Sequence, residues 1–333
     1  LRDLDRVKKT RWLAAAAALG LLALNLVMGE VRGGSMNWLE IGGFTIQPSE
    51  LVKVCYIYAG AATLDRLFAR RNLFGYIVFS AVCVCALALM GDFGTAVIFF
   101  ATFLVVSFMR SGSFATVLLA VSGAGLAGFL VLSVKPYIAQ RFATWGHAWE
   151  DVWDAGFQQT RAMSAAASGG LFGQGAGEGW LKDIVAANTD MVFAVLSEEL
   201  GLIIAVTAML AVIALALFAV RNASQGRSTF YVIAGCAAVS LMMVQMGLNV
   251  FGSLDILPFT GVTFPFVSKG GTSLLSCWML LAFVKATDTR RNASFVVRRE
   301  KSALPRGGPR EAYPEYEDDE DGGEYYDGEE ERS

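Results

Sequence analysis

The chain has 333 residues, of which 55% are hydrophobic and 17% are charged, a composition that excludes an ordinary soluble protein of this size. Its formal net charge of −3 divides into +6 for residues 1–302 and −9 for residues 303–333. These numbers predict a cationic membrane protein with an anionic tail. The five cysteines lie in apolar runs without metal-ligand spacing, which indicates small buried side chains and excludes a zinc site.

Eight apolar runs approach the length of about 20 residues that a helix needs to cross ~30 Å of hydrocarbon. They are apolar on all sides, which is typical of membrane spans and not of an amphipathic soluble bundle. In chain order the predicted helices are residues 12–29, 48–65, 73–90, 92–109, 114–133, 191–220, 229–252 and 272–288. The sequence therefore predicts an all-α polytopic membrane protein with about eight transmembrane helices.

Basic residues lie in every second connection between these runs. They occur within residues 2–11, 66–71, 110, 221–227 and 290–299. Because Lys and Arg in short loops favour the cytoplasmic side, both termini are predicted to be cytoplasmic. The predicted outer segments are residues 30–47, 134–190 and 253–271.

Three parts of the chain differ in composition. We interpret residues 1–11 as a basic cytoplasmic start, residues 12–289 as the transmembrane domain and residues 290–333 as a tail that is first basic and then acidic. The acidic part has too little apolar surface to fold and is predicted to be disordered. The first residue is Leu and no cleavable signal peptide follows, so we expect the chain to begin inside a longer gene product.

The outer segment of residues 134–190 is too long for a simple linker and contains Trp145, Trp149, Trp153 and Trp180. Loops of this length within a compact domain are usually functional. The tryptophans could form an interfacial belt or contact a substrate, and the sequence leaves both interpretations open. His147, the single histidine, is interpreted as a surface residue.

The first polar cluster surrounds the predicted start of the second helix. Pro48 suits a first helical turn, and Glu50 and Lys53, three residues apart, share one face of that helix at the outer membrane surface. Two interpretations follow. The pair could be a local ion pair at a helix start, or it could form the charged wall of a site whose lysine meets a phosphate.

A second cluster precedes the predicted span of residues 191–220. Asp190 could be the N-cap of that helix, or it could be an outer-face general base. Glu198 and Glu199 would follow about 12 Å further along a helix that rises 1.5 Å per residue. We therefore expect these two carboxylates inside the membrane, where they would need partners.

The third cluster occupies residues 258–273, where two prolines and three glycines prevent a simple helix. This pattern predicts a re-entrant or tightly folded loop, because irregular backbone at membrane depth must be satisfied by protein or by a wet cavity. Gln245 and Asn249 precede it on one helical face. Lys269 and the amides near Gly270 and Gly271 could bind an anion, although loop closure alone would explain the glycines.

Several common catalytic motifs are missing from the sequence. It contains no Walker sequence, no His/Cys metal cluster, no nucleophile elbow and no dinucleotide-binding fingerprint. Nucleotide-driven chemistry of these classes is excluded. The residues alone predict an outer-leaflet polar site for an anionic, lipid-associated ligand, walled by Glu50, Lys53, Asp190 and Lys269.

Five motifs, in this order, resemble the SEDS family of bacterial cell-wall polymerases, the FtsW, RodA and SpoVE group. They lie at residues 43–53, 92–96, 156–175, 188–201 and 258–273. Family members usually have ten spans, and the run at 12–29 corresponds to the third, so the resemblance implies that the first two helices are missing. The chain departs from the pattern at Asn188, Lys269 and Met90-Gly91, where His, Tyr and Gln-Pro are common.

The resemblance implies a peptidoglycan glycosyltransferase that polymerises lipid II at the outer face of the bacterial cytoplasmic membrane, for cell division or cell shape. By the same resemblance Asp190 is the general base, and Glu50 and Lys53 shape the catalytic site. The expected substrate contacts are Arg141, Gln158, Ser268, Lys269, Gly270 and Gly271.

The resemblance also implies the partners of the protein. These are lipid II, membrane lipid, a class B penicillin-binding protein with transpeptidase activity, and other divisome or elongasome proteins, with no nucleic acid. A divalent cation, Mg²⁺ or Mn²⁺, is the one candidate cofactor. Two alternatives stay open: a transporter that flips lipid II across the membrane, and a non-catalytic scaffold for the transpeptidase.

Overall fold

The computed structural model describes residues 4–32, 35–64, 70–115, 117–123, 125, 143–223 and 228–287. The chain divides into a unit of Leu1–Thr289 and a second unit of Arg290–Ser333, and the predicted tail lies outside the described residues. The described part is mainly helical, with one small sheet. The predicted class of a helical polytopic membrane protein is confirmed, and the sheet adds to it an element that was not expected.

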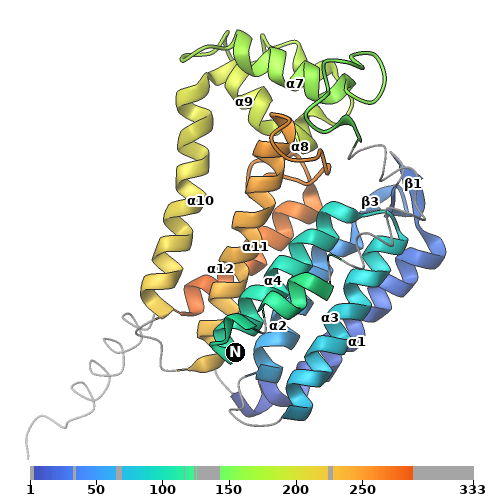
Figure 1. Cartoon of the computed structure of the whole chain (residues 1–333), viewed down its shortest axis with the longest axis vertical. Coiled ribbons are helices and arrows are strands. Elements are labelled where there is room, and N and C mark those ends of the chain that lie inside the picture. The colour runs from blue at the N-terminus through green and yellow to red at the C-terminus, as the bar shows by residue number, and fades with distance from the viewer. Residues whose placement is uncertain are drawn as a thin grey trace, which may run out of the picture. The chain divides into compact units, whose positions relative to one another are not determined.

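Long helices of alternating direction form the body of the molecule (Figure 1). They are α1 (Leu4–Met28), α2 (Pro48–Leu64), α3 (Arg70–Leu89), α4 (Phe93–Ser111), α10 (Leu202–Ala223), α11 (Thr229–Ser253) and α12 (Gly271–Ala286). By length and composition, three segments of the described chain are able to cross a membrane, namely Lys9–Met28, Leu202–Ala223 and Thr229–Ser253. Other apolar helices are shorter, so the number of eight spans stays a prediction.

The first helix begins earlier than expected. Residues 4–11, interpreted from the sequence as a separate basic start, belong to α1, which begins at Leu4. Lys and Arg are good helix formers, so the charged residues continue the helix and do not interrupt it. Of the predicted helix at 114–133, only residues 114–115, 117–123 and 125 are described.

The predicted single span at residues 191–220 is wrong. The chain forms α9 (Val192–Leu200) and α10, and the break between them lies at Gly201, whose φ is 88°. A Cβ at this position would lie 2.3 Å from the carbonyl oxygen of Leu171, so only glycine fits the close approach. Glu198 and Glu199 therefore lie at the end of the short helix α9, which contacts α7 and α10, and not within one long span (Figure 1). Their depth in the membrane stays a prediction.

A three-stranded antiparallel sheet connects α1 to α2. Its strands are β1 (Glu30–Arg32), β2 (Ser35–Ile41) and β3 (Phe44–Ile46), in the order β1-β2-β3. β2 pairs with β3 through Leu39↔Ile46, and the turn between them has two glycines with positive φ. The Met36 amide donates to the Met90 carbonyl at 2.8 Å, which attaches the sheet to the turn between α3 and α4.

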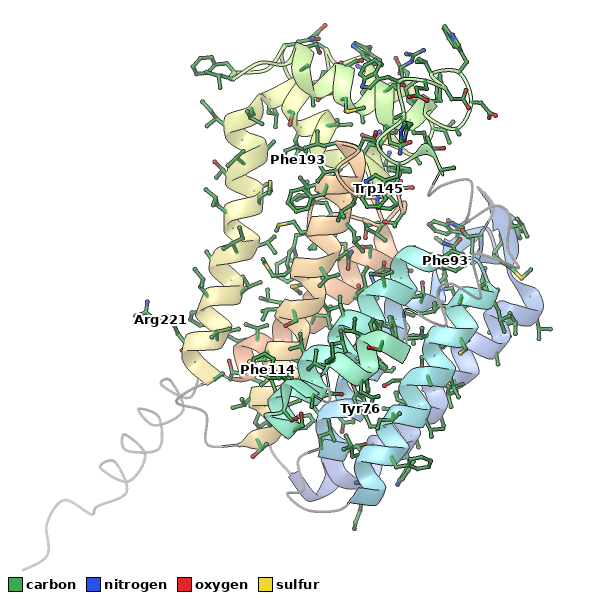
Figure 2. The ribbon with its side chains drawn as sticks, in the orientation of Figure 1. Tyr76, Phe93, Phe114, Trp145, Phe193 and Arg221 are labelled. Carbon is green, nitrogen blue, oxygen red and sulfur yellow. The ribbon has the colours of Figure 1, made fainter. Side chains whose placement is uncertain are left out.

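The remaining elements lie with the sheet at one end of the long helices (Figure 1). They are α7 (Phe157–Ser168), the short 3₁₀ helix η1 (Leu181–Asp183), α8 (Ala187–Asp190) and α9. Figure 2 places Trp145 and Phe93 toward this end, and Arg221, Phe114 and Tyr76 toward the other. The predicted outer segments, where described, therefore share one end, and the side of the membrane that this end faces stays a prediction.

Helix α2 occupies the centre of the bundle, where it contacts α1, α3, α4, α11 and α12. Its small residues permit close packing: a Cβ at Gly60 would lie 2.7 Å from the Tyr76 ring. Val52 and Tyr56 are completely buried. The first turns of α2 therefore place Glu50 and Lys53 where the core meets the outer end.

Candidate functional site

A polar pocket of about 390 Å³ lies at the end of the helices that holds the sheet and α7 to α9. It includes Glu50, Lys53, Asp190 and Lys269, the four residues predicted to form the walls of the site. The lining residues come from segments that are far apart in the sequence. These segments are residues 35–47, 50–53, 91–95, 158, 185–190, 259–263 and 269–273.

Glu50 and Lys53 form a buried ion pair with 3% and 1% of their surface exposed. The Lys53 ammonium lies 2.7 Å from Glu50 Oε1 and donates a second hydrogen bond to Gln245 Oε1 at 3.0 Å. Glu50 Oε2 accepts from the Ser276 hydroxyl at 2.8 Å. The pair is thus a local ion pair and also part of the pocket wall, whereas a contact of Lys53 with a phosphate stays a prediction.

The hydrogen bonds continue from α11 into the irregular segment. Gln245 Nε2 donates to the Thr263 carbonyl at 2.9 Å and to the Thr263 hydroxyl at 2.6 Å. The hydroxyls of Thr263 and Ser273 lie 2.8 Å apart. Together with the ion pair, this chain of polar contacts joins α2, α11, α12 and the segment before α12 into one wall.

Asp190 is the last residue of α8, and its side chain is half-buried at the pocket. The N-cap interpretation is wrong, because Met191 holds the N-cap position of α9 and no side chain caps that helix. The backbone carbonyl of Asp190 accepts from Asn249 Nδ2 at 2.9 Å. An ideal Cβ at Gly261 would lie 3.0 Å from Asp190 Oδ2, so this glycine leaves room directly beside the carboxylate.

The segment predicted to be a re-entrant or folded loop contains no helix or strand between Leu254 and Gly270. The Ser268 hydroxyl donates to the Thr189 carbonyl at 2.6 Å and accepts from the Phe264 amide at 2.7 Å. Ser268 is therefore a buried anchor of the segment and is not among the pocket-lining residues. Its role as a substrate contact has no support in this arrangement.

Of the other predicted substrate contacts, all but Arg141 line the pocket. Gln158, Gly270 and Gly271 line the pocket with Lys269, whose side chain is exposed. Gln158 Nε2 donates to the Val185 carbonyl at 3.2 Å, and the Lys269 amide donates to the Asn188 carbonyl at 2.9 Å. Arg141 lies outside the described residues.

Residues that were not among the expected site residues also line the pocket. Asp92, at the N-cap of α4, accepts from the Thr95 amide at 3.2 Å and from the Ser49 hydroxyl at 3.4 Å. Asn37 and Trp38 reach the pocket from β2. The Asp92 motif was visible in the sequence, whereas nothing local marked β2 as part of the site.

Glu198 and Glu199 have the partners that they were expected to need. Glu198 is completely buried and accepts from the amides of Trp180 and Leu181, each at 3.1 Å. Glu199 accepts from the Gly177 amide at 2.9 Å. Both carboxylates thus organise the glycine-rich loop before α8.

The tryptophans of the outer segment do not contribute to the pocket. Trp145, Trp149, Trp153 and Trp180 are exposed, and none is a lining residue in the described part of the chain. Trp145 Nε1 donates to the Ile256 carbonyl at 3.0 Å. Of the two interpretations, a surface role therefore fits the structure better than direct substrate contact.

The carboxylates of the pocket do not form a cage for a metal ion. No group of three His, Cys, Asp or Glu side chains that could hold a cation occurs among residues with a described position. Glu50 and Asp92 are already engaged by neighbouring donors. This donor set does not fit a metal held by the protein alone, so no step is derived through the predicted Mg²⁺ or Mn²⁺.

Comparison with known proteins gives a match over most of the chain. The family model described as cell cycle protein, of the FtsW, RodA and SpoVE group, matches residues 2–293. Stage V sporulation protein E of Bacillus subtilis is 33% identical over 269 residues, which are 76% of this chain and 72% of that protein. A probable peptidoglycan glycosyltransferase FtsW of Saccharophagus degradans is 35% identical over 295 residues, which are 82% and 75% of the two chains.

Solved structures share the fold. A chain from a peptidoglycan synthase complex, studied for the coordination of polymerization and crosslinking, has a TM-score of 0.70 and 25% identity and covers 86% of this chain and 83% of its own. The rod shape determining protein RodA of Thermus thermophilus has a TM-score of 0.60 and 24% identity, with coverage of 86% and 80%. At 24% identity, the similarity to RodA concerns the fold alone.

Proposed function

This chain belongs to the FtsW, RodA and SpoVE family of cell cycle proteins, and we propose that its pocket polymerises lipid II into glycan strands. It is a multi-pass membrane protein and a peptidoglycan glycosyltransferase that acts in cell division or cell shape. The substrate, the residues that carry the reaction and the orientation in the membrane are the parts that we propose.

The placement of Asp190 carries the proposal. Its carboxylate faces the pocket from a half-buried position beside Gly261. Glu50 and Asp92, which also line the pocket, have structural roles, since Glu50 bonds to Lys53 and Ser276 and Asp92 caps α4. The position of Asp190 at the pocket and the resemblance of its motif to that of the family support Asp190 as the general base.

The proposed reaction is the attack of an acceptor sugar hydroxyl on the anomeric carbon of the donor sugar, with the carrier diphosphate as leaving group. Asp190 takes the proton of the attacking hydroxyl. The Lys269 ammonium and the first backbone amides of α12, which begins at Gly271, stabilise the negative charge of the departing diphosphate. The Gly270 amide does not take part, because it donates to the Ser268 carbonyl at 2.9 Å. Lys53 has a structural role in the pocket wall and does not bind the diphosphate, because its charge is already balanced by Glu50.

The end of the molecule that holds the pocket is proposed to face away from the cytoplasm, with both termini on the cytoplasmic side. The pocket, the sheet and α7 to α9 share that end (Figure 1), and Arg221 lies toward the opposite end (Figure 2). Basic residues at the opposite end agree with the preference of Lys and Arg for the cytoplasmic side. The site would then meet a lipid-linked substrate in the outer leaflet.

A class B transpeptidase is the proposed partner, since the similar peptidoglycan synthase complex coordinates polymerization and crosslinking. The test is glycan synthesis from lipid II by the purified chain with its transpeptidase in detergent. We expect long glycan strands. In detergent a lipid transporter cannot move lipid II between two sides of a membrane, and a scaffold makes no glycan. A lack of glycan strands would therefore contradict the proposed function.

A further inference from the structure

Two large apolar side chains stand at the surface of the loop between α7 and η1. Leu171 is 57% exposed and Phe172 is 82% exposed. Neither residue lines the pocket, and the mechanism described above does not use them. Adjacent apolar side chains that stay at a protein surface give up the free energy of burial, so the pair requires an explanation.

Two glycines hold the backbone of this loop against the end of α9. A Cβ at Gly169 would collide with the Ser197 carbonyl oxygen, and a Cβ at Gly173 would collide with the Glu199 carbonyl oxygen. The Gly173 amide donates to the Gly169 carbonyl at 2.8 Å, which closes the turn. The backbone of the turn therefore packs on α9, and its two apolar side chains are left at the surface.

The same turn is bonded to the start of α10. The Leu202 amide donates to the Gly170 carbonyl at 3.0 Å, and the Ile203 amide donates to the Leu171 carbonyl at 3.4 Å. Helix α10 is long and apolar enough to cross a membrane, and Leu202 and Ile203 are themselves exposed on it. The exposed apolar surface of this span thus continues onto Leu171 and Phe172.

Depth and charge identify what covers this surface. Leu202 is the first residue of its span and lies where α9 meets α10 (Figure 1), so the turn beside it lies where hydrocarbon gives way to headgroups. Residues 162–177 contain no Asp, Glu, Lys or Arg. A stretch without charge enters the edge of the hydrocarbon without the cost that a charged side chain would bring.

We infer that Leu171 and Phe172 insert into the leaflet at the pocket end of the bundle and bind lipid acyl chains there. Lipid is the occupant because the pair continues the surface of a membrane span and has no charged residue in its own turn. The turn packs through Gly173 on α9, the helix that follows Asp190 and Met191. Insertion would therefore hold the helices beside the pocket at a fixed depth in the leaflet.

The test measures which solvent surrounds the pair. Single cysteines, Phe172→Cys and, as a second reading of the same surface, Leu171→Cys, carry a nitroxide label in a chain without the five native cysteines. The protein is reconstituted in vesicles of phosphatidylethanolamine and phosphatidylglycerol. Collisions of the label are recorded with oxygen, which concentrates in hydrocarbon, and with a nickel chelate, which stays in water.

Two exposed positions serve as references. Leu210→Cys lies on α10 and reports the hydrocarbon, whereas Glu178→Cys lies in the same loop as Phe172 and reports the water. We expect the labels at 171 and 172 to collide with oxygen and to lose collisions with nickel, as at 210. The label at 178 should show the opposite. Melting temperatures should match those of the unsubstituted cysteine-free chain, because both native side chains are exposed.

Nickel collisions at 171 and 172 as frequent as at 178 would place the pair in water and overturn the inference. Protection from both reagents would also overturn it, because a second copy of the chain or another protein would then cover the pair. These readings do not depend on glycan synthesis, so they stand apart from the test of the proposed function.

Discussion

Gly261 leaves space for the carboxylate of Asp190: a Cβ at Gly261, where φ is 65°, would lie 3.0 Å from Asp190 Oδ2. The backbone of the irregular segment therefore forms the surface against which the proposed base rests. A left-handed glycine is what permits this approach. The contact connects the conformation of residues 258–263 to the position of one carboxylate.

Replacement of Asp190 with Asn should separate its structural and catalytic roles. Its main-chain carbonyl, which Asn249 holds, is unchanged by the substitution, so the melting temperature should stay near that of the wild type. Loss of the base should lower the polymerisation rate on the order of 100-fold or more. Glycan synthesis by purified protein with its transpeptidase measures this. Asp183→Asn, at an exposed position of η1, is the control, and near-normal synthesis by Asp190→Asn would move the assignment to Glu50.

Gly261→Ala should impair catalysis more than stability. Alanine at positive φ costs about 1–2 kcal/mol, and the new methyl group would displace the Asp190 carboxylate. Gly177→Ala is a matched control, because Gly177 also has positive φ but open space around it. We expect similar decreases in melting temperature for the two variants and a loss of turnover only in Gly261→Ala. Equal turnover in both would show that the contact is irrelevant to the reaction.

The buried pair of Glu50 and Lys53 should behave as a unit. Lys53→Met leaves the Glu50 carboxylate buried without its cation, which should destabilise the protein by about 3–5 kcal/mol. The double variant Glu50→Gln/Lys53→Met removes both charges and should recover most of that stability. Thermal unfolding of the single and double variants in detergent measures the coupling. Additive losses would contradict the coupling of Glu50 and Lys53.

Gly201→Ala should disrupt the break between α9 and α10. A Cβ at Gly201 would lie 2.3 Å from the Leu171 carbonyl oxygen, and its φ of 88° disfavours alanine as well. We expect a loss of folded protein, seen as a lower melting temperature and reduced yield of monodisperse material. Gly42→Ala, at positive φ in open space, is the control and should cost much less. Comparable stability of the two variants would contradict the assigned break.

Cysteine labelling tests the proposed orientation. In a background without the five native cysteines, Val185→Cys and Glu178→Cys should react with an impermeant thiol reagent added to intact cells. Both positions are exposed at the pocket end. Ser111→Cys, exposed at the far end of α4, should react only after permeabilisation. Labelling of Ser111→Cys from outside would reverse the assignment of the two membrane sides.

The sequence predicted the long helices well, because runs without charge leave few alternatives to a membrane span. It missed the sheet, although two Gly-Gly pairs, at residues 33–34 and 42–43, separate the short strands, because the whole stretch was interpreted as an outer loop. It also missed the break at Gly201, because hydropathy is continuous through α9 and α10 while the close approach of Leu171 is visible only in three dimensions.

The charged residues of the site could be predicted from the sequence, whereas the uncharged residues that the fold brings to the pocket could not. Glu50, Lys53, Asp190 and Lys269 stood out as charged residues at the ends of apolar runs, and the pocket includes all four. Asn37 and Trp38 have no charge and no motif that would mark them in the sequence. They line the pocket only because the fold places β2 beside the turn before α4.

The hydrogen bond between Ser276 and Glu50 joins residues 226 positions apart in the chain. During biosynthesis the helices leave the ribosome in order, so Glu50 enters the membrane long before α12 is made. Its carboxylate has no hydroxyl from α12 to bond until that last described helix is in place. A chain that stops before α12 would therefore have an incomplete pocket, and an intact site identifies a chain whose insertion has reached α12.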